Sequence, residues 1–155
     1  MIGRTALFTP ANRPARINAT VAIKSDSLVF DLEDSVSPEE KDAARILLRE
    51  ALRSLDFLKN RSILIRVNDP ATGYFIDDIN EIVPLGYFPL IIPKASEAGI
   101  IKAEKQLQAL ETRLGLKHQT SLIPLIETPQ GVILSLLLPG EKDPPLRDKK
   151  EMICI

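Results

Sequence analysis

Charged and amide side chains follow short apolar runs at five places along the 155-residue chain. They are Asn12 and Arg13; Asp31, Glu33 and Asp34; Arg66; Lys94; and Glu127. In parallel α/β sheets the carboxyl ends of the strands meet at one rim, where functional groups collect. We therefore expect these side chains, which are far apart in sequence, to form one polar site.

Two of these residues suit a defined chemistry. Glu127 is a candidate Mg²⁺ ligand, because Mg²⁺ favours one or two carboxylates together with substrate oxygens and waters; otherwise it is an exposed carboxylate at a strand end. Arg66 lies in an apolar run, so its charge must face a polar site. Its guanidinium can grip a substrate carboxylate through two hydrogen bonds, or it can form a structural ion pair with the acids that follow the preceding strand.

The other charged residues admit more than one role. Asp31, Glu33 and Asp34 could orient Arg66, bind a metal or begin a solvated loop. Lys94 could bind an anionic group or neutralise these acids. The only histidine, His118, lies in a predicted helix-to-strand loop at the opposite edge, so a Ser-His-Asp or Cys-His site is not expected. The chain has neither a dinucleotide-binding glycine motif nor a phosphate-binding P-loop.

Short apolar runs, separated by amphipathic stretches, must position the candidate site. We predict strands at residues 5–9, 28–32, 62–67, 89–93 and 122–126. These runs do not alternate polar and apolar residues, which is typical of strands buried on both faces of a parallel sheet.

Between the predicted strands, apolar residues recur with the spacing of an α-helix. We predict helices near residues 14–21, 37–58, 76–83 and 96–115. Ser37, Pro38 and Glu40 match a capping box at the start of the second helix, and Ser96 and Gly115 match the two ends of the last. The order is four βα units and a fifth strand, which indicates an α/β fold with a mostly parallel sheet.

Composition limits the function classes. Hydrophobic residues make up 45% and charged residues 26%, with a net charge of −1, so neither extensive disorder nor a nucleic-acid or membrane partner is expected. Cys154 is the only cysteine, so no intramolecular disulfide can form. Without a signal peptide or a long apolar run, we expect a cytoplasmic location. Residues 139–155 contain three prolines and eight charged residues, and we predict an irregular tail there.

Five sequence segments together resemble a known family. They are residues 7–14 (LFTPANRP), 30–36 (FDLEDSV), 65–68 (IRVN), 93–94 (PK) and 126–131 (IETPQG). Each is a weak signal alone, but in this order they resemble the citrate lyase β-subunit (CitE-like) group of the HpcH/HpaI aldolase superfamily. The resemblance covers about Arg4 to Leu134.

The resemblance implies a (β/α)8 TIM barrel and an Mg²⁺-dependent carbon–carbon lyase. Such enzymes cleave a citryl- or malyl-thioester, carried by CoA or an acyl-carrier protein, to an acetyl-thioester plus oxaloacetate or glyoxylate. By motif match, Arg66 would hold the substrate carboxylate and carbonyl, and Glu127 would bind Mg²⁺. Supporting residues would be Glu33, Asp34 and Lys94, with Asn12 and Arg13 near the thioester carrier.

The chain also departs from the family pattern. The family's second metal carboxylate follows the sixth strand, about where this chain reads Met152-Ile153-Cys154. A complete barrel typically has about 250 residues. We therefore expect a barrel truncated after about five βα units, with residues 1–138 as its N-terminal part and 139–155 as an atypical tail. We expect weak Mg²⁺ binding, little lyase activity alone, and association as a homo-oligomer or with other lyase subunits.

Two other interpretations compete with the lyase. The first is a non-catalytic binding or subunit-interaction module derived from the same family. The second is a five-strand response-regulator receiver, which needs an acceptor aspartate at the end of its third strand and acids after its first. Here the third run carries Arg66 and no acid follows the first, so the receiver is disfavoured.

Overall fold

The fold is an α/β sheet whose six strands are all parallel and lie in chain order, as seen in a computed structural model that describes residues 4–129, 131–132 and 153–154. The strands are β1 (Ala6–Pro10), β2 (Ser27–Asp31), β3 (Ser62–Arg66), β4 (Leu90–Ile92), β5 (Leu122–Ile126) and β6 (Ile153–Cys154). The helices are α1 (Pro14–Ala19), α2 (Lys41–Ser54), α3 (Tyr74–Ile82) and α4 (Glu97–Leu114). The five predicted strands are thereby confirmed within one residue at each end.

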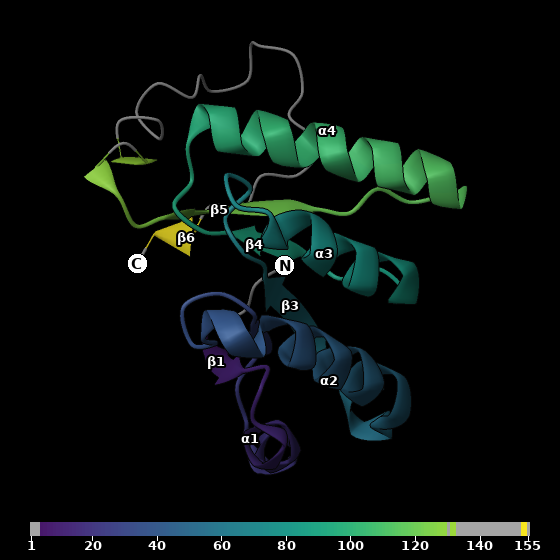
Figure 1. Cartoon of the computed structure of the whole chain (residues 1–155). Helices are drawn as coiled ribbons and strands as arrows, with labels where there is room; N and C mark the ends of the chain where they lie inside the picture. Colours follow the sequence, from purple (N-terminus) through teal and green to yellow (C-terminus); the bar gives the residue numbers. More distant parts are fainter. Residues whose placement is uncertain (1–3, 130, 133–152, 155) are drawn as a thin grey trace.

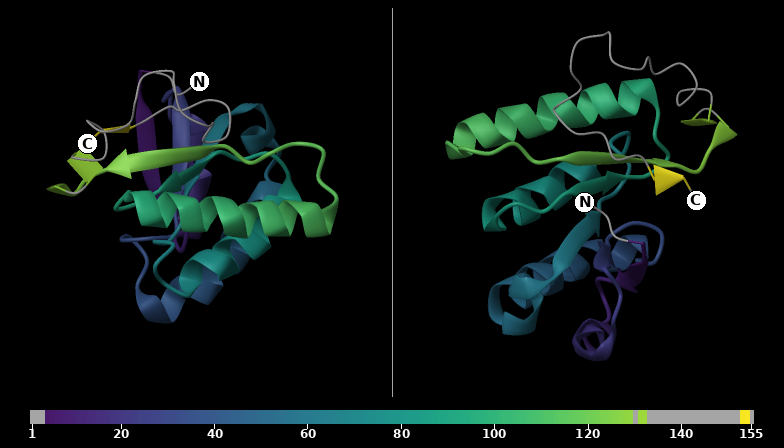
Figure 2. Two further views of the ribbon diagram at one scale, coloured as in Figure 1. Left: turned by 90° about the horizontal axis from the view of Figure 1, so that it is seen from above. Right: turned by 180° about the vertical axis from the view of Figure 1, so that it is seen from behind.

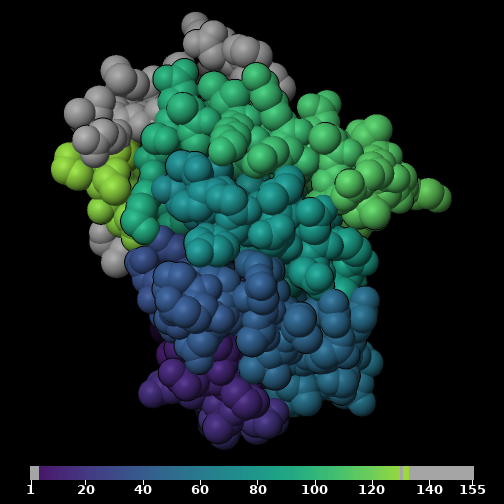
Figure 3. Space-filling model, viewed as in Figure 1, coloured from purple at the N-terminus to yellow at the C-terminus, as the bar shows by residue number. Residues whose placement is uncertain are grey.

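The helices α2, α3 and α4 lie along one side of a curved sheet (Figures 1 and 2). The space-filling view shows the successive units stacked in chain order on this side, from purple at one end to green at the other (Figure 3). A parallel sheet in sequential order with its helices on one side is the arrangement of a TIM-barrel wall.

Side-chain alternation along the strands divides the core in two. Phe30 and Ile65 belong to the large cluster that packs against the helices. Their neighbours Val29 and Leu64 belong to a smaller cluster on the other face of the sheet. Because successive residues of a strand point to opposite faces, this division fixes which strand-end residues share the inner face.

The start of α2 differs from the prediction. Pro38–Glu40 forms a 3-10 turn, α2 begins at Lys41, and the Ser37 side chain makes no capping hydrogen bond. Glu40 instead accepts hydrogen bonds from the Ser37 hydroxyl, at 3.2 Å, and from Asn12 Nδ2, at 2.8 Å. The predicted capping box is therefore wrong, because its glutamate carboxylate binds side chains rather than the backbone at the helix start.

The ends of α4 match the prediction, whereas the predicted face of the first helix does not. Ser96 Oγ accepts a hydrogen bond from Gly99 N–H at 3.2 Å, and Gly115 ends α4 in the left-handed conformation with φ 63°. In the first helix Ile17 is buried, but Val21 is 60% exposed. The reason is that α1 ends at Ala19 and a 3-10 turn, Thr20–Ala22, carries Val21 away from the core.

The predicted irregular tail falls mostly outside the described residues. Its two described residues, Ile153–Cys154, form β6 and pair in parallel with Leu125 and Ile126. The prediction of an irregular tail over residues 139–155 therefore stays a prediction. Among the helices that the structure describes, none has the length and apolarity needed to cross a membrane.

Candidate active site

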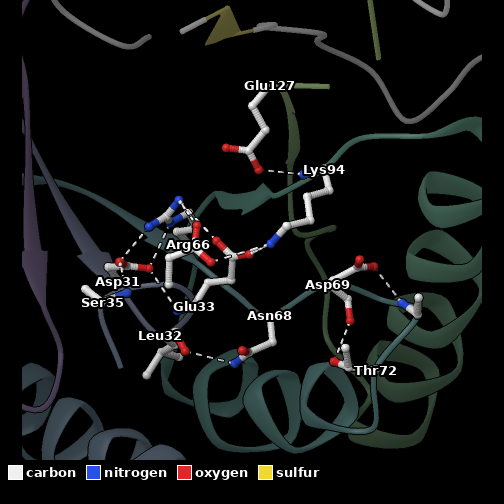
Figure 4. A network of polar contacts seen from close by, with 12 residues as sticks. Asp31, Leu32, Glu33, Ser35, Arg66, Asn68, Asp69, Thr72, Lys94 and Glu127 are labelled. Atoms are coloured by element: carbon white, nitrogen blue, oxygen red, sulfur yellow. Dashed lines mark hydrogen bonds and ion pairs between the residues drawn. The ribbon is translucent and has the colours of Figure 1, made fainter. Parts of the chain in front are cut away.

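Strand alternation places three of the predicted site residues on the inner face of the sheet. Asp31 is two residues after Val29, and Arg66 is two residues after Leu64, so both share the side of the smaller cluster. Glu127 stands in the same relation to Leu125. Asp31 and Arg66 are also direct partners in the β2–β3 register. The predicted gathering of these residues at one rim is therefore what the structure shows (Figure 4).

Arg66 is held by Asp31 through two hydrogen bonds. Its Nε lies 2.8 Å from Asp31 Oδ1, and its Nη2 lies 2.7 Å from Asp31 Oδ2. The third nitrogen, Nη1, lies 3.1 Å from Glu33 Oε2 and 3.7 Å from Asp34 Oδ2. The guanidinium carbon stands 5.2 Å from the centre of the Phe8 ring, within the range of a cation–π contact. Burial lowers the pKa of Arg66, but the hydrogen bonds and charge of Asp31 and its neighbours outweigh burial and raise it.

Asp31 is itself fixed by the turn that follows β2. Its Oδ1 accepts the backbone N–H of Glu33 at 2.8 Å, and its Oδ2 accepts that of Ser35 at 3.2 Å. Burial raises the pKa of this carboxyl, but the hydrogen bonds from Arg66, Ser35 and Glu33 outweigh it and leave the pKa lowered. Asp31 is thus a buried anion that orients Arg66.

Glu33 stands between the two cations of the rim. Its side chain is 6% exposed and forms ion pairs with Lys94 and Arg66. Burial is the largest influence and raises the pKa of Glu33, despite the two cations. Its Oε2 atom accepts no hydrogen bond within the described part of the chain. Glu33 is therefore more costly to keep charged than Asp31.

Lys94 connects the acidic cluster to Glu127. Its Nζ pairs with Glu33 and lies 3.5 Å from Asp34 Oδ1, and the hydrogen bond to Glu33 raises the pKa of Lys94. Its backbone N–H donates to Glu127 Oε1 at 2.8 Å. Lys94 is also the only non-glycine residue described with positive φ, at 48°, a conformation that costs roughly 1–2 kcal/mol for a residue with a Cβ.

Arg66 and Glu127 line the same open hollow. Its volume is about 490 Å³, and its other lining residues are Phe8, Thr9, Pro10, Arg16, Asp31 and Ser35. A guanidinium, a carboxylate and an aromatic ring therefore face one space at the carboxyl ends of the strands. A small dicarboxylic or oxo acid could contact both charges there.

The described residues fit Mg²⁺ only through Glu127. This carboxylate is exposed, and one of its oxygens accepts the Lys94 N–H. The neighbouring acids Asp31 and Glu33 are already paired with cations. Among the described residues, no group of three potential metal ligands comes together. The described residues thus offer Mg²⁺ one carboxylate. This is the smallest number of carboxylates that Mg²⁺ sites commonly have when substrate oxygens and water complete the coordination shell.

The predicted carrier-binding residues lie beside this hollow rather than in its lining. Asn12 is half-buried and donates to Glu40 Oε2, and Arg13 is exposed immediately before α1. Arg16, one turn further along α1, lines the hollow instead. His118 is exposed in the α4–β5 loop, where its ring meets Tyr87 edge-on at 5.8 Å.

Sequence reasoning missed several residues that support the rim. Lys41 donates to the Leu32 and Glu33 carbonyls, and Asn68 donates to the Leu32 carbonyl and to Asp78. A lysine at the start of an amphipathic helix resembles a solvated residue, so its sequence position gave no sign of burial. Asn68 was visible as part of a motif, but its partners were not.

Comparison with known proteins assigns the chain to a family. A family model described as HpcH/HpaI aldolase/citrate lyase matches residues 4–134. The chain belongs to the HpcH/HpaI aldolase/citrate lyase family. Citrate lyase subunit beta of Leuconostoc mesenteroides subsp. cremoris is 32% identical over 142 residues, which cover 90% of this chain and 47% of that protein. L-malyl-CoA/beta-methylmalyl-CoA lyase of Rhodobacter capsulatus is 30% identical over 135 residues, which cover 84% of this chain and 42% of that protein.

Solved structures support the same assignment. The citrate lyase beta subunit from M. tuberculosis, complexed with oxaloacetate and magnesium, is 30% identical and matches with a TM-score of 0.63, covering 86% of this chain and 52% of that one. A malate synthase from Haloferax volcanii is 16% identical with a TM-score of 0.68, which shows the shared fold alone. The α/β fold of TIM-barrel type is thereby confirmed. This chain spans about half the length of the curated relatives it matches.

Proposed function

We propose that this chain supplies the oxo-acid subsite and one Mg²⁺ ligand of a carbon–carbon lyase acting on a citryl- or malyl-thioester. The observation that carries the proposal is the hollow that Arg66 and Glu127 share, with Arg66 oriented by Asp31. Names of the relatives support it, since they include a citrate lyase subunit, a malyl-CoA lyase and a structure complexed with oxaloacetate and magnesium.

The residues suit the bond cleavage. In the lyase direction the hydroxyl group loses its proton, the neighbouring carbon–carbon bond breaks, and the hydroxyl-bearing carbon becomes the oxo carbon of oxaloacetate or glyoxylate. The bonding electrons pass to the acetyl-thioester fragment, which takes up one proton, so that no proton is gained or lost overall. Arg66 would bind the carboxylate and the forming oxo group through charge-assisted hydrogen bonds. Mg²⁺, when bound at Glu127, would supply Lewis-acid polarisation of the same oxygens.

The remaining rim residues have supporting roles in this proposal. Glu33, Asp34 and Lys94 set the charge around Arg66, and Lys94 also holds Glu127 through its backbone N–H. Asn12 and Arg13 would lie toward the thioester carrier, either CoA or an acyl-carrier protein. The carrier-binding positions remain a prediction from motif match.

Calorimetry tests the oxo-acid subsite. With Mg²⁺ present, oxaloacetate should bind the 155-residue chain weakly, and Arg66→Ala should reduce affinity about 10- to 100-fold, the equivalent of a charge-assisted interaction. Arg66→Lys keeps the positive charge but loses the paired N–H donors of the guanidinium, and it is the second variant if Arg66→Ala does not fold. Arg53→Ala removes an exposed arginine of α2 and should leave affinity unchanged. Absence of binding, or equal binding by the Arg66 variants, would contradict the site.

An assay of thioester cleavage tests what the chain does alone. With one carboxylate for the metal among the described residues, we expect weak Mg²⁺ binding and no measurable cleavage of citryl- or malyl-CoA by the purified chain. Cleavage at a rate lost in Glu127→Gln would show instead that the chain is a complete catalyst. If oxaloacetate and Mg²⁺ both fail to bind, the non-catalytic interaction module becomes the better interpretation.

A further inference from the structure

The backbone carbonyls of Leu32 and Glu33 are bound by two buried side chains from outside the rim. Lys41 Nζ donates to the Leu32 carbonyl at 2.7 Å and to the Glu33 carbonyl at 2.6 Å. Asn68 Nδ2 donates to the Leu32 carbonyl at 3.0 Å, a contact drawn in Figure 4. Lys41 is 6% exposed and Asn68 is 4% exposed, so these hydrogen bonds are shielded from bulk water.

Asn68 is in turn fixed from α3. Its backbone N–H and its Nδ2 both donate to Asp78 Oδ2 at 2.7 Å. Asp78 is fully buried, and its other oxygen accepts from Arg45 Nη1 of α2 at 3.1 Å. The Leu32 carbonyl is therefore anchored to both helices that cover β2 and β3.

Leu32 occupies the position where a small movement has the largest effect on the candidate site. It lies between Asp31, which orients Arg66 through two hydrogen bonds, and Glu33, which pairs with Arg66 and Lys94. A shift of the Leu32–Glu33 backbone would move both carboxylates at once. Precise placement of a binding group depends on such supporting hydrogen bonds.

We propose that Lys41 and Asn68 are positioning residues that fix the orientation of Arg66 by holding the backbone of Asp31–Glu33. This inference rests on the proposed function for its relevance to oxo-acid binding. The geometry it concerns, however, can be measured without any ligand. The Arg66 Nε–H, which donates to Asp31, reports directly on the arrangement.

The experiment uses ¹⁵N NMR to compare the rate of solvent exchange of the Arg66 Nε–H in the unsubstituted chain and in Lys41→Met. The methionine side chain is about as long as that of lysine but has no hydrogen-bond donor. Loss of two charge-assisted hydrogen bonds should accelerate the exchange by about tenfold or more. Arg66→Lys identifies the resonance by its disappearance. The matched control is Leu107→Ala, a buried α4 residue whose loss destabilises the core without touching the rim. Asn68→Ala is the second variant and should act in the same direction.

Each outcome has a separate meaning. Equal exchange in Lys41→Met and Leu107→Ala at matched stability would show a purely structural role and overturn the proposal; if Lys41→Met does not fold, the same comparison with Asn68→Ala decides. Oxaloacetate titration of the same samples addresses the proposed function separately. Faster exchange together with no oxaloacetate binding by the unsubstituted chain would retain the positioning role and reject the oxo-acid subsite.

Discussion

The two sides of the rim differ in how firmly their charges are held. On the β2–β3 side, Arg66 is 12% exposed and shares two hydrogen bonds with Asp31, whose own backbone neighbours are anchored by buried donors. On the β5 side, Glu127 is exposed, and Lys94 N–H is the donor to one of its oxygens. The proposed anion-binding side is thus held by several internal contacts, whereas Glu127 on the proposed metal-binding side is held by one described hydrogen bond.

The largest expected effect comes from removing the cation of the firmly held side. Arg66→Ala leaves Asp31 and Glu33 buried without their guanidinium partner, so the free energy of unfolding should fall by about 3 kcal/mol, as for other broken buried pairs. Urea unfolding followed by circular dichroism measures the change. A loss below about 1 kcal/mol, within the range of ordinary surface pairs, would show that the two sides do not differ in this way.

The residue that joins the two sides should show a smaller effect, of backbone origin. Lys94 has a φ of 48°, which glycine adopts without steric cost. Lys94→Gly and Lys94→Ala both lose the side-chain ion pairs, so the difference between their free energies of unfolding isolates the cost of the backbone conformation. We expect the glycine variant to be more stable than the alanine variant by about 1 kcal/mol in urea unfolding. Equal stability would mean that the left-handed conformation is not retained.

The pH dependence of stability should reveal the cost of charging Glu33. Because its pKa is raised above the ordinary 4.5, the folded chain binds more protons than the unfolded chain between pH 4.5 and the raised value. The free energy of unfolding must therefore fall as pH rises through this window. Glu33→Gln cannot titrate and should show a shallower slope. The remaining slope would come from Asp78, whose pKa is raised by burial.

Asp31 serves as the internal contrast for this measurement. Its pKa is lowered below 3.8, so its contribution to stability is present above that value and is lost only as pH falls through the lowered pKa. It does not affect the slope between pH 4.5 and 7. Parallel slopes in the unsubstituted chain and in Glu33→Gln would contradict a raised pKa for Glu33.

The smallest expected effect on stability belongs to the loosely held side. Glu127→Gln keeps an oxygen for the Lys94 N–H and removes only an exposed charge, so the free energy of unfolding should change by less than about 0.5 kcal/mol. The same variant should lose the Mg²⁺-dependent part of oxaloacetate binding in calorimetry. Addition of EDTA to the unsubstituted chain should reproduce that loss. A large destabilisation would show that Glu127 is part of the internal framework after all.

Much of this arrangement could be predicted from the sequence because it follows from strand periodicity. The apolar runs locate the strands and the carboxyl ends of the strands define the rim, which predicts that Arg66, Glu33 and Glu127 lie together. The predicted capping box at Ser37 is wrong because Glu40 has several possible hydrogen-bond donors nearby, and the local sequence does not show which of them it binds. The buried role of Lys41 and the left-handed Lys94 depend on tertiary contacts that no local spacing encodes.

The strand order has a consequence for how the molecule is made. Each strand from β2 onward pairs with the strand immediately before it in the chain, so every new βα unit finds its partner already synthesised. Pairing of this kind adds one strand at a time to strands already made, which suits assembly from the N-terminus as the polypeptide leaves the ribosome. Asp31 and Arg66 would meet when β3 joins β2, well before Glu127 is translated, so the proposed anion-binding side of the rim would be in place ahead of the proposed metal-binding side.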